Sequence, residues 1–270
     1  MFDFLLDAII DVLKLIPFLF ISFLIMELIE HKLNNKKSLS KANQYGPFIG
    51  STLGIIPQCG FSALASNLYA ARVITLGTLI SVYLSTSDEM LPIMISHKTN
   101  ITIILKILLI KFLIGLLFGF LIDILYRKRH STDIKHFCKE EHCHCEESII
   151  KSSLIHTLRI AAYILLINFT LNALINEDII RHFASNNKIL APIITSIIGL
   201  IPNCASSVII TELYLDDIIS LGSCLSGLLA GSGVGFLVLF KQNKNVKENI
   251  AILFILILIA SICGIIFNLI

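Results

Sequence analysis

Four apolar segments of this chain are each long enough to cross a lipid bilayer. They are, roughly, residues 5–29, 101–126, 154–175 and 249–270. A helix rises about 1.5 Å per residue, so about 20 apolar residues span the hydrocarbon core of a membrane. The fold class that this pattern predicts is an all-α polytopic membrane protein.

The composition agrees with this class and excludes a soluble enzyme. Hydrophobic residues make up 56% of the 270 residues and charged residues only 15%, whereas a soluble protein carries about 25% charged residues. The net charge of +2 leaves no basic surface for nucleic acid. The seven cysteines are an odd number and several lie in apolar segments, which favours free thiols or metal ligands over a disulfide framework.

Four further apolar segments are interrupted. The segments 46–71 and 190–214 each carry a proline, a polar residue and a cysteine in the middle, which predicts a broken helix or a re-entrant hairpin. The segments 73–96 and 218–240 are interrupted by STSDE at 85–89 and by GSG at 231–233. Irregular backbone at membrane depth is stable only when it is buried in protein or lines a wet cavity. The interruptions are therefore candidate binding sites.

The sequence repeats itself at an offset of 145 residues. GIIPQC at 54–59 matches GLIPNC at 199–204, and the same offset pairs Pro47 with Pro192 without a gap. A register kept over this length indicates two homologous halves. The predicted organisation is a first membrane repeat at 1–128, a cytoplasmic His/Cys-rich loop at 129–149 and a second, inverted membrane repeat at 150–270.

The basic residues predict the orientation of the repeats. Lys and Arg accumulate in short cytoplasmic loops. If each Pro–Cys segment enters and leaves the membrane on the same side, most Lys and Arg residues share one face; its segments are 31–45, Arg72, 127–151 and 241–248. Each half then crosses the membrane an odd number of times, so the halves are inverted, as in secondary transporters. We expect a multi-pass protein of the cell membrane with a cytoplasmic central loop, both termini outside and no cleaved signal peptide.

The two Pro–Cys interruptions form the first candidate substrate site. Each proline ends a half-helix and leaves carbonyl groups without partners, and the next half-helix, expected to begin near Ser62 or Ser207, offers N–H groups. Free carbonyl groups at a helix end bind cations, and free N–H groups at a helix start bind anions. The alternative is that small residues only permit close helix packing. The predicted substrate-binding residues here are Gln58, Cys59, Ser62, Asn203, Cys204, Ser206 and Ser207, with Cys59 and Cys204 as metal ligands.

The interruption at 85–89 forms the second candidate site. A carboxylate near the bilayer centre costs about 3 kcal/mol, so Asp88 is interpreted as a proton or metal-cation ligand, ahead of Glu89. Ser87 and its equivalent Ser232 complete the predicted site. The alternative is that the two acidic residues cap a short helix at the outer interface. The remaining charges in apolar segments are interpreted as structural, because they lie near helix ends or can reach the interface; they are Glu27, Lys106, Lys111, Asp123 and Arg159.

The third candidate site is the central loop, in which histidines and cysteines cluster. Together they bind zinc, copper and other soft or borderline ions. Their spacing matches no closed zinc finger, which favours a flexible capture or sensing tract outside the permeation path. The alternative is a solvated linker. The predicted loop ligands are His136, Cys138, His142, Cys143, His144 and Cys145.

At these residues the chain resembles a family of heavy-metal exporters with ten predicted transmembrane segments, whose members are commonly labelled arsenic efflux proteins or manganese transporters. The resemblance covers nearly the whole chain. It rests on GIIPQCGFS at 54–62, TSDE at 86–89, GLIPNCA at 199–205 and the His/Cys loop. It implies export of a metal or metalloid across the cytoplasmic membrane.

The predicted function is therefore secondary transport that exports a heavy metal or metalloid by alternating access. A proton or cation gradient is expected to drive it, because the chain has no nucleotide-binding motif. Arsenite prefers three thiolates, and the two Pro–Cys interruptions offer two. The sequence therefore leaves two substrate classes open: arsenite and a divalent cation such as manganese or zinc. The alternative is a carrier of a small organic anion or amino acid with a metal-sensing loop.

An enzyme is not expected, because the chain lacks both a Gly-x-Ser-x-Gly element and a His-Glu-x-x-His helix. No cofactor is expected beyond a metal ion bound as substrate or by the loop. The expected partners are the lipid bilayer, the substrate and a coupling proton or cation, without nucleic acid. The small residues in the apolar segments permit a homodimer.

Overall fold

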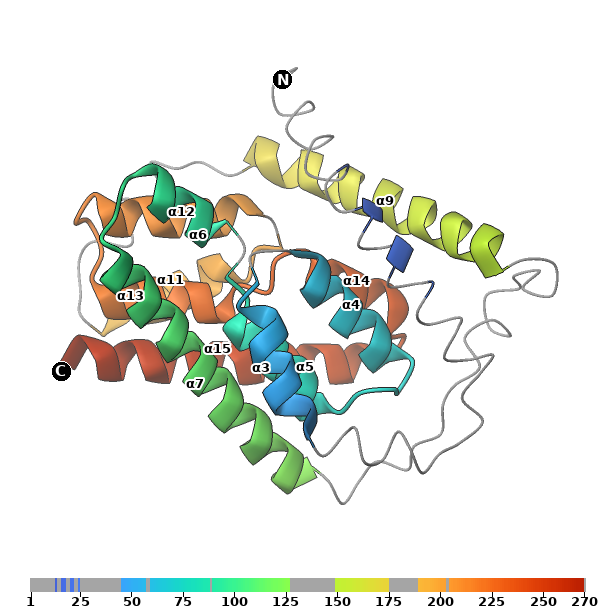
Figure 1. Ribbon diagram of the computed structural model, residues 1–270, viewed down its shortest axis with the longest axis horizontal. Helices are drawn as coiled ribbons and strands as arrows, with labels where there is room; N and C mark the ends of the chain where they lie inside the picture. Colours follow the sequence, from blue (N-terminus) through green and yellow to red (C-terminus); the bar gives the residue numbers. More distant parts are fainter. Residues whose placement is uncertain are drawn as a thin grey trace.

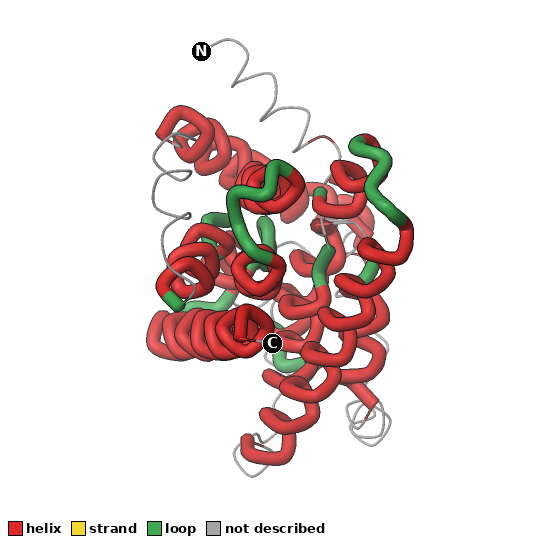
Figure 2. Tube along the Cα trace, turned by 90° about the vertical axis from the view of Figure 1, so that its left-hand side faces the viewer, coloured by secondary structure: helices red, strands yellow, loops and turns green. Residues whose placement is uncertain are grey.

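The computed structural model describes residues 45–56, 59–87, 89–126, 149–174, 189–202 and 204–269, together with six single residues between 13 and 24. Within these ranges the regular elements are helices and no strand occurs (Figures 1 and 2). Among the described residues, three helical stretches are long and apolar enough to cross a membrane: Ile101–Tyr126, Leu221–Gln242 and Val246–Leu269. The fold is that of an all-helical polytopic membrane protein, as predicted. Most of the predicted span 5–29 lies outside the described residues.

The helices of the two halves have matching bounds. The first half contains α3 (Gly46–Gly54), α4 (Cys59–Ala70), α5 (Leu76–Ser85), α6 (Met90–Ser96) and α7 (Ile101–Tyr126). The second contains α9 (Ile149–Leu174), α11 (Leu190–Gly199), α12 (Cys204–Leu215), α13 (Leu221–Ala230), α14 (Gly235–Gln242) and α15 (Val246–Leu269). The bounds of α4 and α5, shifted by 145 residues, are those of α12 and α13. The expected interruptions of the third apolar segment of each half are present, between α5 and α6 and between α13 and α14.

Equivalent residues also build equivalent turns. After α4 and α12 the chain turns through a residue with positive φ, 62° at Arg72 and 55° at Asp217. The next helix then begins with a hydroxyl cap: the Thr78 N–H donates to Thr75 Oγ1 at 3.2 Å, and the Ser223 N–H donates to Ser220 Oγ at 3.3 Å. Such caps satisfy N–H groups that a helix start leaves without partners.

The core of each half is one short helix, α5 or α13. Nearly every residue of both is buried, so neither helix has a face toward lipid or water. α3 and α7 pack on α5, and α11 and α15 pack on α13. A Cβ added at Gly77 would lie 2.2 Å from the Gly119 carbonyl oxygen, and one at Gly222 would lie 2.4 Å from that of Gly264. Only glycine permits this approach of the backbones.

The two halves interlock through α4 and α12. α4 packs on α14 and α12 packs on α6, so the second helix of each Pro–Cys pair lies against the opposite half. At the first of these contacts, Ser66 Oγ lies 2.8 Å from the Gly235 carbonyl oxygen and 2.7 Å from the Tyr83 hydroxyl. α9 covers this contact, because Ile160, Ala161 and Ile164 are buried in one cluster with residues of α4 and α14.

The long helix α7 presents an apolar stripe to its surroundings. Leucines repeat along it at four-residue spacing, which places them on one face. All of them are at least half exposed, and they are Leu105, Leu109, Leu113 and Leu117. Such a continuous row of exposed leucines is the surface that a helix turns toward lipid.

Equivalent connections lie at opposite ends of α15. Arg72, after α4, binds Glu248 in the first turn of α15, and Ser220, after α12, donates to Asn268 Oδ1 in its last turn at 2.6 Å. At 1.5 Å per residue, Glu248 and Asn268 are about 30 Å apart along the helix, which is the thickness of the hydrocarbon core. Figure 1 shows α15 running from the end of α14 across the molecule to the C-terminus.

Candidate functional site

The break between α5 and α6 lies against the end of α3. Ser87 is buried in this break, and its hydroxyl donates to the Ile55 carbonyl oxygen at 2.6 Å. Ile55 is the C-cap that follows α3, so its carbonyl has no partner within the helix. The predicted site residue Ser87 thus joins the helix break of the first half to the first Pro–Cys interruption.

The equivalent break of the second half holds a buried hydroxyl that has no partner among the described residues. Ser232 is 0% exposed, and its Oγ makes no hydrogen bond to any described residue. The second Pro–Cys interruption is close by, because a Cβ added at Gly231 would lie 3.5 Å from the Gly199 carbonyl oxygen. An unsatisfied buried hydroxyl costs about 1–3 kcal/mol, so Ser232 is a position at which a polar ligand would be stabilised.

Lys111 connects the broken helices of the two halves. Its ammonium group donates to the Thr86 carbonyl oxygen, and to the Leu228 carbonyl oxygen at 2.8 Å. Thr86 is the C-cap of α5, and Leu228 lies in the last turn of α13. Carbonyl groups at these positions lack helical partners, and both helix ends carry partial negative charge. A single cation therefore holds the C-terminal ends of one broken helix from each half.

The interpretation of Lys111 as a charge near a helix end is wrong. It is the eleventh residue of a 26-residue helix and is 0% exposed, so its ammonium group does not reach an interface. Lys106 is exposed on the same helix, because five residues turn an α-helix by about 140° and bring the two lysines to different faces. The signal that could have identified Lys111 is its central position in an uninterrupted span, where a side chain cannot reach water.

Asp123, in contrast, is structural as predicted. It accepts hydrogen bonds from the Thr75 hydroxyl at 2.8 Å and from the Gly77 N–H at 2.9 Å, and so supports the start of α5. Asn268 replaces it at the equivalent position of α15 and accepts from Ser220. The carboxylate is thus used as a hydrogen-bond acceptor near the end of a span.

The second helices of the Pro–Cys pairs begin earlier than expected. α4 begins at Cys59 and α12 at Cys204, three residues before Ser62 and Ser207. The expectation placed these starts near Ser62 and Ser207, and the structure places them about one helical turn earlier. Ser62 and Ser207 consequently lie within their helices and are buried, and neither begins one.

The structure describes only some of the other residues predicted at the Pro–Cys interruptions and at the helix breaks. The Ser206 hydroxyl donates to the Ile201 carbonyl oxygen at 3.1 Å and so links α12 to the chain before it. Glu89 is half-buried, and its side chain makes no capping hydrogen bond to α6. Backbone alone is described for Cys59 and Cys204. Gln58, Asp88 and Asn203 lie outside the described residues.

No metal centre is formed within the part of the chain that the structure describes. None of its groups of His, Cys, Asp and Glu side chains has the three or more members needed to hold an ion. The predicted loop ligands lie outside the described residues; they are His136, Cys138, His142, Cys143, His144 and Cys145.

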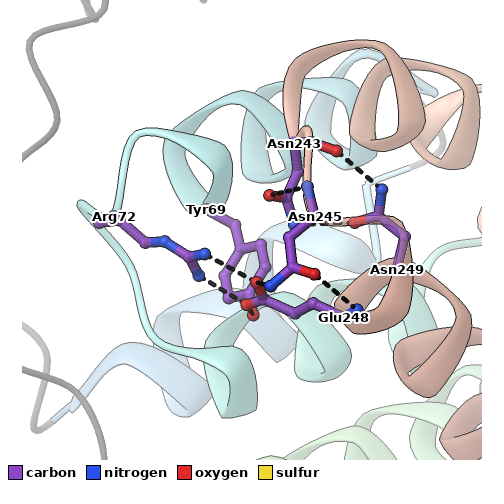
Figure 3. A network of polar contacts seen from close by, with 6 residues as sticks. All are labelled: Tyr69, Arg72, Asn243, Asn245, Glu248 and Asn249. Carbon is purple, nitrogen blue, oxygen red and sulfur yellow. Dashed lines mark hydrogen bonds and ion pairs between the residues drawn. The ribbon is translucent and has the colours of Figure 1, made fainter.

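A polar network joins the halves at the start of α15 (Figure 3). The Arg72 guanidinium donates to both oxygens of Glu248, at 2.6 and 2.7 Å, and the Tyr69 hydroxyl donates to the same carboxylate. The Asn245 side chain caps α15 by accepting from the Glu248 N–H at 3.4 Å. The hydrogen bond to Glu248 raises the pKa of Arg72 above its usual value, against the effect of burial.

The buried helix breaks, the close glycine contacts and the lipid-facing leucines define a polytopic membrane protein in which two similar sets of helices are interlocked. The chain belongs to a family of membrane exporters, because residues 1–178 match the family described as "Putative, 10TM heavy-metal exporter". This confirms the family that the sequence motifs indicated and places the chain among transporters of heavy metals. No curated protein and no solved structure matches the chain.

Proposed function

We propose that the protein is a secondary transporter that exports a heavy metal or metalloid by alternating access. The observation that carries this proposal is the pair of equivalent helix breaks, which follow α5 and α13. Thr86, Ser87 and Ser232 are buried in them, and Lys111 links the helix ends that precede them. Transporters built from repeats bind substrate and coupling ions at discontinuous helices near the bilayer midplane. The two halves are expected to move relative to one another around these breaks.

An inverted arrangement of the halves is supported by the two ends of α15. Equivalent connections, 71–75 and 216–220, contact that helix about 30 Å apart along its axis. Inversion of two repeats would bring equivalent connections to opposite membrane faces, and the separation along α15 supports this arrangement. With the central loop 129–149 in the cytoplasm, Arg72 and Glu248 lie on the cytoplasmic side and both termini lie outside.

The proposed transport site uses residues from both interruptions and both breaks. Cys59 and Cys204 supply soft thiolate ligands, Gln58 and Asn203 supply amide oxygens, and Asp88 binds a metal cation or a proton. Hydroxyl groups complete the set, and the orphaned hydroxyl of Ser232 supports this assignment. The ligand types suit arsenite as well as manganese or zinc. The His/Cys loop is proposed to supply or sense the metal.

Transport into inside-out membrane vesicles tests the proposal. Vesicles that contain the protein are expected to accumulate radioactive arsenite, manganese or zinc when a proton gradient is imposed. Matched vesicles with the Cys59→Ser/Cys204→Ser double variant should not accumulate it. If none of the three accumulates, and an organic acid instead raises the melting temperature of the purified protein, the protein is a carrier of organic anions.

A further inference from the structure

We infer that the Lys111 ammonium group is a built-in monovalent cation, which occupies a cation site between the ends of α5 and α13 in place of a free ion. The inference deepens the proposed function and rests on its picture of two halves that meet at broken helices. The inferred site has the chemistry of a binding site for an ammonium or alkali cation, and the Lys111 side chain occupies it.

The first argument is the identity of the groups that Lys111 contacts. The Leu228 carbonyl oxygen would accept from the N–H of Ser232 if α13 continued, but α13 ends at Ala230. The Thr86 carbonyl oxygen is left in the same way by the end of α5. Both carbonyl oxygens are therefore left without a helical N–H donor. The Lys111 ammonium group donates to both of them and so replaces the missing donor in each half.

The second argument is charge. The C-terminal end of a helix carries roughly half a negative charge, so two such ends match one monovalent cation. In transporters with discontinuous helices, unwound carbonyl groups and the ends of half-helices coordinate the coupling cation. Lys111 places a positive charge between two such ends.

The third argument is that the lysine is present in the first half and is not repeated at the equivalent position of the second half. The residue equivalent to Lys111 in the second half is Leu256, which is fully buried in an apolar cluster. A lysine needed only to stabilise each half would be expected at both positions. A single lysine with one acceptor in each half fits a site that belongs to the contact between the halves.

Chemical rescue of a shortened side chain tests the inference. The variant Lys111→Ala is purified, and its melting temperature is measured in choline chloride and, at equal ionic strength, in ammonium, methylammonium, sodium or potassium chloride. In choline, the variant is expected to melt about 5 °C below the wild type. At least one small cation should restore half of this difference or more, with a saturating dependence on its concentration.

The matched control is Lys106→Ala, which removes the same side chain from an exposed position of α7. This variant and the wild type should respond equally to the small cations, and only Lys111→Ala should show a further stabilisation beyond that response. If Lys111→Ala does not accumulate, Lys111→Gln replaces it, because the amide can donate to one carbonyl and leave the other for an ion. The inference is overturned if no small cation stabilises the purified Lys111 variant. It is also overturned if Lys111→Ala or Lys111→Gln is as stable as the wild type in choline.

Melting temperature reports occupancy of the cation site without any transport. The inference can therefore fail while export of a metal is observed. It can also hold when the vesicle experiment shows that the protein carries another substrate, which would contradict the proposed function alone.

Discussion

Arg72 and Glu248, 176 residues apart in the chain, form a bidentate ion pair that joins the first half of the protein to the second. The two side chains are only 15% and 18% exposed, so water screens the pair less than it screens a surface salt bridge. Because the pair connects α15 to the turn after α4, it has to open if the halves separate on this side. It is the contact whose removal should most directly change the balance between conformations.

A double-mutant cycle measures this contact. Arg72→Ala and Glu248→Ala should each lower the melting temperature, and the double variant should be little worse than the more damaging single variant. The expected coupling is about 1.5 kcal/mol, because charge-assisted bidentate hydrogen bonds are lost as a unit. Additive effects of the two changes would show that the pair contributes nothing to the joining of the halves.

Ser87→Ala and Ser232→Ala are expected to change stability in opposite directions. Ser87 donates to the Ile55 carbonyl oxygen, so its loss leaves a partly buried acceptor unsatisfied and should cost about 1–2 kcal/mol. Ser232 has no partner among the described residues, so its loss removes a buried polar group and should be neutral or stabilising. Under the proposed function, Ser232→Ala should also weaken substrate binding. Thermal unfolding with and without metal or arsenite measures both effects; destabilisation by Ser232→Ala without ligand would contradict the assignment.

Gly235→Ala is expected to separate α4 from α14. A Cβ at this position would lie 2.9 Å from Ser62 Cβ and 3.0 Å from Tyr83 Cε1, and overpacking of this kind costs about 1–3 kcal/mol. Gly231→Ala is the matched control, because its nearest heavy atom would be 3.4 Å away. Gly235→Ala should lower both the melting temperature and the transport rate. The control is compared by melting temperature, which Gly231→Ala should not change. Equal behaviour of the two variants would show that this helix contact is not critical.

Most of the helices could be predicted from the sequence, because local properties determine them. The apolar length of 101–126 predicted α7, and the polar and glycine residues at 85–89 and 231–233 predicted the breaks that follow α5 and α13. The basic residues placed Arg72 and 241–248 on one face, and the contact between Arg72 and Glu248 agrees with this placement. Each of these features depends on neighbouring residues or on charge alone.

The contacts between the halves could not be predicted. Whether a lysine within a span is buried depends on which face of its helix packs inside the protein. The sequence of α7 shows two lysines but not that Lys111, rather than Lys106, faces α13. The partner of Arg72 was equally hidden, because the positive-inside rule assigns a side of the membrane and not a contact. The start of α4 was placed about one helical turn too late, because the sequence shows the proline that ends one half-helix but not the residue at which the next begins.

Cys59→Ser/Cys204→Ser is expected to abolish metal or arsenite resistance in a sensitised cell while the protein still reaches the membrane. A hydroxyl group is a far poorer ligand than a thiolate for soft ions. The control is the double variant Cys224→Ala/Cys263→Ala, which removes two buried free cysteines outside the Pro–Cys interruptions. The control should retain resistance. Resistance at the wild-type level in the Cys59→Ser/Cys204→Ser variant would exclude thiolate ligands from the transport site.

Cysteine labelling from the two sides of the membrane tests the inverted arrangement. In a cysteine-free background, Lys244→Cys lies just before α15 and Asp216→Cys lies just after α12, and both positions are exposed. A membrane-impermeant maleimide should modify Asp216→Cys in intact cells and Lys244→Cys only in inside-out vesicles. Lys247→Cys and Asp217→Cys are the second reporters for the two sides. Because Glu248 and Asn268 fix these regions to opposite ends of one spanning helix, labelling of both positions from the same side would mean that α15 does not cross the membrane and that the repeats are not inverted.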